Sequence, residues 1–168
     1  MDDFDRYLFQ EAFKYAADNS DDDFIRVGAV LVRDNKIISY GTNRMLDGVE
    51  KRPERMKMPE FLDWVYHAER DALSNARRDL VSIVGAKMYC PWKPCIDCAK
   101  EVISAGVSEM IFHQETNDYA DARCDEDWGQ NKAVEILDAC KTITHRTVSG
   151  NVFEHDFYVQ FFESDFNP

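Results

Sequence analysis

Two short motifs in this sequence carry side chains that could do chemistry together. Residues 67–69 read His-Ala-Glu, and residues 94–98 read Pro-Cys-Ile-Asp-Cys. Each motif opens a segment with helical spacing, so each can project side chains past the start of a helix. Cys95 and Cys98 are three residues apart and therefore share a helix face. A helix N-terminus also lowers the pKa of a thiol toward the metal-binding thiolate.

One imidazole and two thiolates form a ligand set that suits zinc. The three candidate ligands His67, Cys95 and Cys98 leave the fourth tetrahedral position open, which distinguishes a catalytic zinc site from a closed structural one. Zinc in such a site lowers the pKa of water toward neutrality. Glu69 is placed to take the proton of that water and pass it to a substrate. The two motifs therefore predict a hydrolytic Zn²⁺ site.

Each motif taken alone has other interpretations. An isolated Pro-Cys-x-x-Cys could be a redox pair or half of a structural zinc site. A lone His-x-Glu is usually a pair of polar residues on the protein surface. A structural site needs a fourth ligand, for which Cys90 and His113 are the nearest in sequence. Cys90 falls on a predicted strand, where burial in the core is the simpler explanation. The presence of both motifs, each at a helix start, favours the catalytic interpretation.

The elements that must position these motifs follow from the hydrophobic pattern. Apolar spacing predicts a helix over Phe4–Asp18, and Val27–Val32 and Ile37–Tyr40 read as a hairpin around Asp34-Asn35. The remaining strands are predicted over Ala86–Cys90, Val107–Phe112 and Thr142–Val148, and the remaining helices through Ala68–Ala76, Pro94–Ala105 and Asp127–Cys140. The order predicts one α/β domain over residues 1–168. We expect a three-layer α/β/α sandwich around a mixed five-stranded sheet, with parallel pairing after the hairpin.

Composition narrows the possible partners. The 168 residues include 32 acidic and 20 basic ones, for a formal net charge of -12. A nucleic-acid strand or an anionic membrane is held by clustered Lys and Arg, so neither is expected as a partner. No apolar run is long enough to span a membrane, and the acidic start is unlike a signal peptide, so we expect a cytoplasmic protein. Five cysteines, an odd number, favour metal binding or burial over a disulfide framework.

The two motifs and several further segments give the sequence a family resemblance. It resembles the zinc-dependent cytidine and deoxycytidylate deaminase family, and within it the deoxycytidylate (dCMP) deaminases. The segments that match in the family's order are 27–30, 41–43, 67–73, 85–89 and 94–100. The resemblance implies a cytidine deaminase-like fold and hydrolytic, zinc-dependent conversion of a cytosine nucleotide, dCMP, to dUMP with release of ammonia. It also implies a homo-oligomer.

The resemblance assigns roles to particular residues. Glu69 would carry protons to the ring N3 and to the leaving amine. Asn43 would contact the base or the sugar, and the Ala68 backbone would border the ring, as would the segment just before Pro94. Trp92 could stack on the base, although packing is the simpler role for a large aromatic residue before a helix. No Cys or His precedes His67, so we expect one zinc ion per chain.

The connection from Asn43 to Tyr66 is long, has no clear strand and is locally basic. A connection of this length is unusual in a compact domain and tends to be functional. Its cations are Arg44, Lys51, Arg52, Arg55 and Lys57. Paired guanidinium donors suit a 5′-phosphate, so the cluster favours a small-molecule nucleotide substrate, with Arg44 as a candidate contact. A solvated loop of mixed charge is the alternative for each residue taken singly.

Other substrates and a different class of function stay open. Arg44 replaces the Gly that commonly follows Asn43 in dCMP deaminases, so the resemblance does not extend to nucleotide regulation. The Cys90–Lys93 stretch is unusual for the family, so the substrate could be dCTP or a modified cytosine nucleotide. A tRNA adenosine deaminase and a catalytically inactive binding module are further alternatives. The aromatic tail over residues 151–168 must be buried against the core or a neighbouring subunit.

Overall fold

The computed structural model describes residues 1–22, 25–57, 59–123 and 129–153. Cys124 and the part of the aromatic tail after Phe153 lie outside these ranges. Along the chain the elements are α1 (Asp3–Asn19), β1 (Gly28–Arg33), β2 (Lys36–Thr42), β3 (Arg44–Met45), α2 (Phe61–Trp64), β4 (Val65–Tyr66), α3 (Ala68–Arg78), β5 (Lys87–Tyr89), α4 (Ile96–Ser104), β6 (Glu109–His113), α5 (Gln114–Arg123), α6 (Gln130–Ala139) and β7 (Thr144–Val148).

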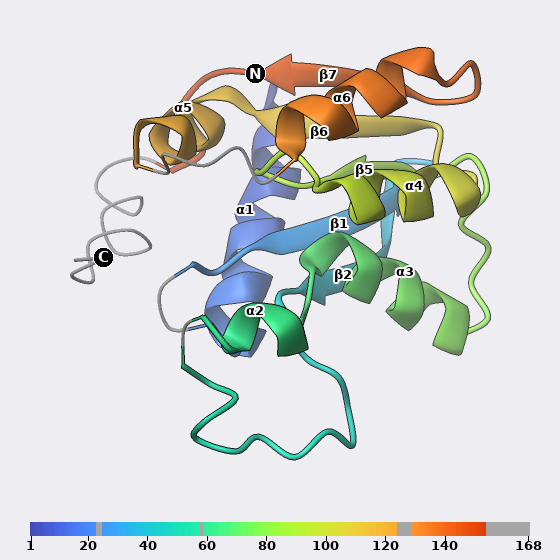
Figure 1. Cartoon of the computed structure of the whole chain (residues 1–168). Helices are drawn as coiled ribbons and strands as arrows, with labels where there is room; N and C mark the ends of the chain where they lie inside the picture. Colours follow the sequence, from blue (N-terminus) through green and yellow to red (C-terminus); the bar gives the residue numbers. More distant parts are fainter. Residues whose placement is uncertain (23–24, 58, 124–128, 154–168) are drawn as a thin grey trace.

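The main sheet has five strands in the order β2-β1-β5-β6-β7 (Figure 1). β5, β6 and β7 pair in parallel, which confirms that part of the prediction. β1 pairs antiparallel with both β2 and β5, so the expected parallel pairing does not begin directly at the hairpin. The chain crosses from β2 to β5 through α3, and these two strands run in the same direction. Because β1 lies between them in the sheet, it is antiparallel to both.

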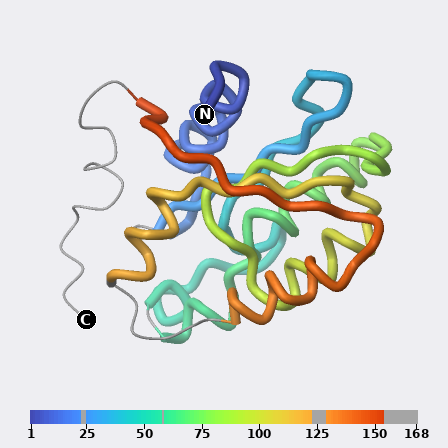
Figure 2. Tube along the Cα trace, turned by 90° about the horizontal axis from the view of Figure 1, so that it is seen from above, coloured from blue at the N-terminus to red at the C-terminus, as the bar shows by residue number. Residues whose placement is uncertain are grey.

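Helices cover both faces of this sheet, which confirms the three-layer α/β/α prediction. α1 lies on one side, while α3, α4 and α6 lie on the other (Figure 2). The α1 layer packs Phe9 and Phe13 against Val30 and Ile111. The opposite layer packs a second buried cluster that includes Leu73 and Ala99 of the helices with Met88 and Met110 of the strands. Burial of these apolar surfaces fixes the helices whose first turns carry the two motifs.

Two parts of the chain differ from the sequence prediction. The long connection contains a short helix, α2, and its ends pair as a two-stranded ribbon in which Arg44 faces Tyr66 and Met45 faces Val65. Strands of two residues carry no periodicity, so the sequence gives no signal for them. Helix α5 is also unpredicted, because its sequence is mostly polar and has little amphipathic pattern.

The four cysteines of the described ranges are free thiols, and no helix within those ranges is long and apolar enough to cross a membrane.

A buried carboxylate ties α1 to the sheet. Asp5 is 4% exposed and accepts hydrogen bonds from both terminal nitrogens of Arg146, at 2.8 and 2.7 Å, and from the Tyr89 hydroxyl at 2.8 Å. Burial acts to raise the pKa of Asp5, but the hydrogen bonds from Arg146 and Tyr89 outweigh it, so the net pKa is lowered. The ionised form of Asp5 is therefore the one that stabilises the fold.

This arrangement predicts an acid-dependent loss of stability. Because the folded pKa of Asp5 is lowered, its contribution is complete above the unfolded value of about 4 and disappears as pH falls through the folded value. We expect Asp5→Asn to lower the urea midpoint at pH 7, and we expect the difference in midpoint from wild type to be smaller at pH 3 than at pH 7. Urea unfolding followed by circular dichroism at both pH values measures this. A difference in urea midpoint between wild type and Asp5→Asn that does not change with pH would contradict the role of the ionised carboxylate.

Candidate active site

The structure brings the His67, Cys95 and Cys98 side chains together. His67 is the residue before α3 and Cys95 is the residue before α4, while Cys98 lies in the first turn of α4. The Sγ atoms of Cys95 and Cys98 lie 3.5 and 3.6 Å from Nδ1 of His67, and the three ligand atoms all fall within 4.8 Å of one another. Two helix starts from distant parts of the sequence therefore meet at one point.

The chemistry of this donor set fits a zinc ion. A hydrogen bond from the Cys98 thiol holds the pKa of Cys95 well below its usual range, and the same contact raises the pKa of Cys98. The lowered pKa favours the thiolate form of Cys95, which is the form that binds a metal. Arg70 is close by: burial acts to lower the pKa of its guanidinium, but the charges of Cys98 and Cys95 raise it. Its positive charge offsets the negative charge of a thiolate pair.

Glu69 is the buried carboxylate next to this cluster. It lies in the first turn of α3 and is 4% exposed. Burial raises the pKa of Glu69. A carboxyl group with a raised pKa is suited to accept a proton and give it up again.

Glu69 and His67 open into a cavity of about 370 Å³. Its walls come from the segment before β1, the end of β2, the α2 region, the start of α3 and the segment before α4. The lining residues are Asp22, Ile25, Val27, Asn43, Phe61, Leu62, Val65, His67, Ala68, Glu69, Trp92, Lys93, Cys95 and Gln130. The volume and the mainly apolar walls suit a small planar molecule with a few polar groups.

The predicted substrate contacts fall into different environments. Ala68 and Trp92 both line the cavity, and their contacts with a bound ring stay predictions. Trp92 is 8% exposed, and its Nε1 has no hydrogen-bond partner in the described part of the chain. The indole therefore lines the cavity with an apolar ring and leaves one buried donor, Nε1–H, unpaired within the described residues.

Asn43 also lines the cavity, but its amide is engaged by the chain segment before β1. Its Oδ1 accepts hydrogen bonds from the Val27 N–H and the Ser20 hydroxyl, both at 2.8 Å. Its Nδ2 donates to the Ile25 carbonyl and, at 3.3 Å, to the Asp22 carboxylate. The geometry gives Asn43 the role of holding this segment at the cavity wall.

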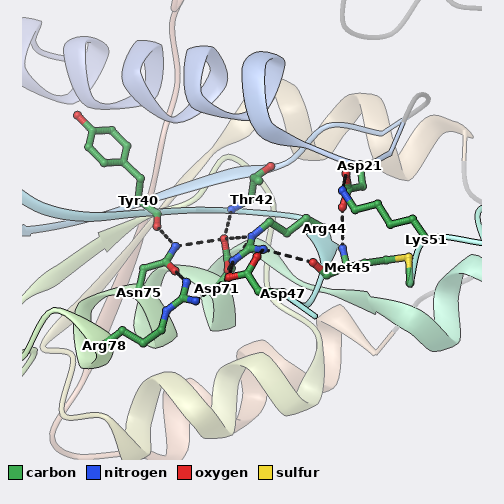
Figure 3. A network of polar contacts seen from close by, with 10 residues as sticks. All are labelled: Asp21, Tyr40, Thr42, Arg44, Met45, Asp47, Lys51, Asp71, Asn75 and Arg78. Carbon is green, nitrogen blue, oxygen red and sulfur yellow. Dashed lines mark hydrogen bonds and ion pairs between the residues drawn. The ribbon is translucent and has the colours of Figure 1, made fainter. Parts of the chain in front are cut away.

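Arg44 does not line the cavity and instead ties the long connection to α3. Its Nε donates to both carboxylate oxygens of Asp71 at 3.1 Å, and Asp71 is 1% exposed (Figure 3). Asp71 also accepts from the Thr42 N–H at 3.1 Å. Asp47 joins the network through Arg44 at 2.7 Å and Arg78 at 2.6 Å. The guanidinium predicted to contact a phosphate is thus held by two carboxylates.

Other cations of the long connection are also engaged within the protein. Lys51 pairs with Asp21 at 2.5 Å, and Arg52 pairs with Glu50 at 2.7 Å. The Arg55 guanidinium lies 4.0 Å from the ring centre of Trp64. The contribution of this connection to the cavity is instead apolar, through Phe61, Leu62 and Val65.

The Arg44 network makes a testable prediction about stability. We expect Arg44→Met to lower the free energy of unfolding by about 3 kcal/mol, because it leaves Asp71 buried and without its ion-pair partner. The matched control is Arg52→Met, which removes an exposed ion pair and should change stability by less than about 1 kcal/mol. Urea unfolding of both variants measures the difference. An equal decrease in the free energy of unfolding of the two variants would contradict the larger contribution expected of the buried Arg44–Asp71 pair.

Several cavity residues were not predicted from the sequence. Phe61 and Leu62 come from a connection that lacks a regular pattern, and Gln130 comes from the start of α6. Lys93 belongs to the segment just before Pro94, which the resemblance placed beside the ring without naming Lys93 itself. Asn117 of α5 lies behind this segment and holds it in place.

The fold and the site together define a class of protein: an α/β protein with a cluster of one His and two Cys next to a cavity that a buried glutamate lines. Comparison with known families makes this more specific. Residues 2–114 match the model of the cytidine and deoxycytidylate deaminase zinc-binding region. The chain belongs to this family.

Relatives in this family share part of the chain. The deoxycytidylate deaminases of Homo sapiens and Mus musculus are each 34% identical over 113 residues, which is 63% of this chain and 62% of theirs. The matched region is thus less than two thirds of the length of these relatives. The deoxycytidylate deaminase of Mycobacterium phage D29 is 28% identical over 127 residues, 68% of this chain and 97% of that protein.

A solved structure supports the fold. The dCMP deaminase from the cyanophage S-TIM5 superposes with a TM-score of 0.61 at 21% identity, over 88% of this chain and 100% of that one. A tRNA:A34 deaminase reaches 0.51 at 19% identity, over 86% of this chain and 97% of that one. The cytidine deaminase-like fold predicted from the sequence is confirmed.

Proposed function

We propose that this protein is an enzyme, a zinc-dependent hydrolase that deaminates a cytosine nucleotide, dCMP to dUMP, with release of ammonia. The observation that carries the proposal is the cluster of His67, Cys95 and Cys98 at the edge of a cavity that His67, Cys95 and the buried Glu69 line. Relatives named deoxycytidylate deaminases at 34% identity support the choice of substrate. So does a structural neighbour solved in complex with dCMP and dUMP.

His67, Cys95 and Cys98 would hold the zinc ion in this proposal. Zinc bound there supplies the activation of a water molecule for attack on the ring. The Cys95 and Cys98 backbones are fixed at the start of α4, and His67 is fixed at the start of α3. We expect one zinc ion per chain, measurable by elemental analysis of purified protein.

Glu69 moves the protons in the proposed reaction. Its carboxylate accepts a proton from the water that attacks C4 of the cytosine, and it delivers that proton to the ring N3. It then transfers the second proton of the water to the amino group, which leaves as ammonia when the C4–N bond breaks. Water and the cytosine ring thus become ammonia and a uracil ring. Burial keeps bulk water from exchanging these protons.

Apolar walls would hold the base beside Glu69. Phe61, Val65 and Trp92 line the same cavity and offer flat or branched surfaces to a planar ring. The Ala68 backbone borders the same space. Asn43 would act through the segment that it holds, which contributes Ile25 and Val27 to the wall.

Four alternatives differ from this proposal in substrate or class. The same chemistry would serve dCTP, a modified cytosine nucleotide or a tRNA adenosine. A polynucleotide substrate fits the net charge of -12 poorly. A catalytically inactive binding module would have no use for a buried Glu69 next to the metal ligands.

A substrate panel tests the proposal. Zinc-loaded protein is incubated separately with cytidine, dCMP, dCDP, dCTP, adenosine and single-stranded DNA, and ammonia release is followed. We expect the highest kcat/KM with dCMP. Activity on polynucleotide alone would contradict the proposal, and no activity on any of these substrates would favour a binding module.

We further propose a cytoplasmic homo-oligomer that acts on free nucleotides. The family resemblance supports the assembly, and exposed apolar side chains such as Phe4 and Tyr7 on α1 are available to an interface. Small-angle scattering of the purified protein measures its mass. A clean monomer of 19.5 kDa would contradict the assembly.

A further inference from the structure

Lys93 stands out among the residues that line the cavity. Of the described lining residues, it is the one lysine or arginine. Its ammonium forms no ion pair and no hydrogen bond within the described ranges, whereas Arg44, Lys51 and Arg52 of the long connection are each paired with a carboxylate. The cavity therefore contains a cation that is free to meet a ligand.

The backbone of Lys93 is fixed by two amide side chains. The Lys93 N–H donates to Oδ1 of Asn117 at 2.9 Å, and Nε2 of Gln130 donates to the Lys93 carbonyl at 3.4 Å. Asn117 is 1% exposed and donates in turn to the carbonyls of Pro91, at 2.9 Å, and His113, at 2.7 Å. Helix α5 thus sets the path of the segment that leads to Cys95. A lysine on a fixed backbone loses less entropy on binding than one on a mobile loop.

The position of Lys93 suits an anionic group at the end of the substrate away from the reacting carbon. Only Pro94 separates Lys93 from Cys95, and the ammonium of Lys93 ends a flexible four-carbon stem. The Asp22 carboxylate that shares the cavity is engaged by the Ile25 N–H, at 2.9 Å, and by the Asn43 amide. A phosphate monoester carries a charge of about -1.5 to -2 at pH 7, which an unpaired ammonium in a partly buried site attracts strongly.

We propose that Lys93 is the specificity-determining residue that binds the 5′-phosphate of the nucleotide, in place of the cations of the long connection. This inference rests on the proposed function. In this inference the segment just before Cys95 distinguishes a nucleoside monophosphate from a nucleoside. The long connection from Asn43 to Tyr66 does not.

The test compares ligands with and without the phosphate. Binding of dUMP and deoxyuridine to zinc-loaded protein is measured by calorimetry for wild type, Lys93→Gln and Lys93→Arg. We expect Lys93→Gln to weaken dUMP binding by about tenfold to a hundredfold, the size of one lost charge-assisted contact, and to leave deoxyuridine binding within about twofold. Lys93→Arg keeps a cation and should retain most of the preference for dUMP. The matched control is Lys100→Gln, an exposed residue of α4 outside the cavity lining.

The outcomes separate this inference from the proposed function. If wild type deaminates cytosine nucleotides while Lys93→Gln keeps the full dUMP preference, the assignment of Lys93 is overturned and the function stands. Loss of the preference in Lys57→Gln instead would move the phosphate site to the long connection. A wild-type protein that shows no preference for dUMP over deoxyuridine would also overturn the assignment. Absence of deamination on every substrate would refute the function itself.

Discussion

Glu69→Gln is expected to retain one zinc ion per chain and to lose turnover of dCMP by about 10²- to 10⁴-fold, the contribution of a positioned general acid–base group. The substitution preserves the shape of a side chain that is 4% exposed. It removes the one property that the proposed reaction needs, a carboxylate that can accept and release a proton. Steady-state ammonia release gives kcat and KM, and elemental analysis gives the zinc content.

The control for this experiment is Glu135→Gln on α6, an exposed carboxylate paired only with Lys132 in the described contacts. It should leave kcat unchanged. Because a general acid–base role acts on the chemical step, the loss in Glu69→Gln should fall on kcat, with KM changed little. A Glu69→Gln enzyme with zinc bound and an appreciable share of the wild-type kcat would remove Glu69 from its assigned role.

The sequence was sufficient to predict the parts of the site that depend on local spacing. The helices that follow the two motifs were predicted from apolar periodicity, although α4 begins at Ile96 and not at the predicted Pro94. The i, i+3 spacing of Cys95 and Cys98 predicts that both thiols lie on one face. The five-stranded sheet and its covering helices follow from the alternation of strands and helices after the hairpin. These features need no knowledge of which distant residues meet.

The features that the sequence did not reveal depend on long-range partners. Arg44 looked available for a phosphate, but it meets Asp71 only because α3 packs across the end of β2. The side-chain amide of Asn43 is hydrogen-bonded to Ser20 and Val27, which lie some twenty residues earlier in the chain. Asn117 acts from a helix with too little pattern to predict, and its partners lie in the segment before α4. Composition indicates how many charges exist, but only the fold shows which are paired.

Gly41 is the position where a single methyl group should disturb the site most. A Cβ there would lie 2.1 Å from the backbone nitrogen of Ala72 and 2.3 Å from the carbonyl oxygen of Ala68, both in α3. Backbone atoms cannot rotate away as a side chain can, so α3 must move off β2. That movement would carry His67 and Glu69 away from Cys95. We expect Gly41→Ala to lower the free energy of unfolding by about 3 kcal/mol and to weaken metal binding.

Gly28→Ala is the matched control, because it creates the same kind of clash on the opposite face of the sheet. Its Cβ would lie 1.9 Å from the carbonyl oxygen of Ala12 in α1, a helix that contributes no residue to the cavity lining. Both variants should be destabilised in urea unfolding, but competition with a zinc chelator should show weakened binding in Gly41→Ala alone. Equal metal affinity in the two folded variants would mean that α3 can shift without moving the ligands. Close packing of α3 on β2 would then stabilise the fold without setting the geometry of the metal site.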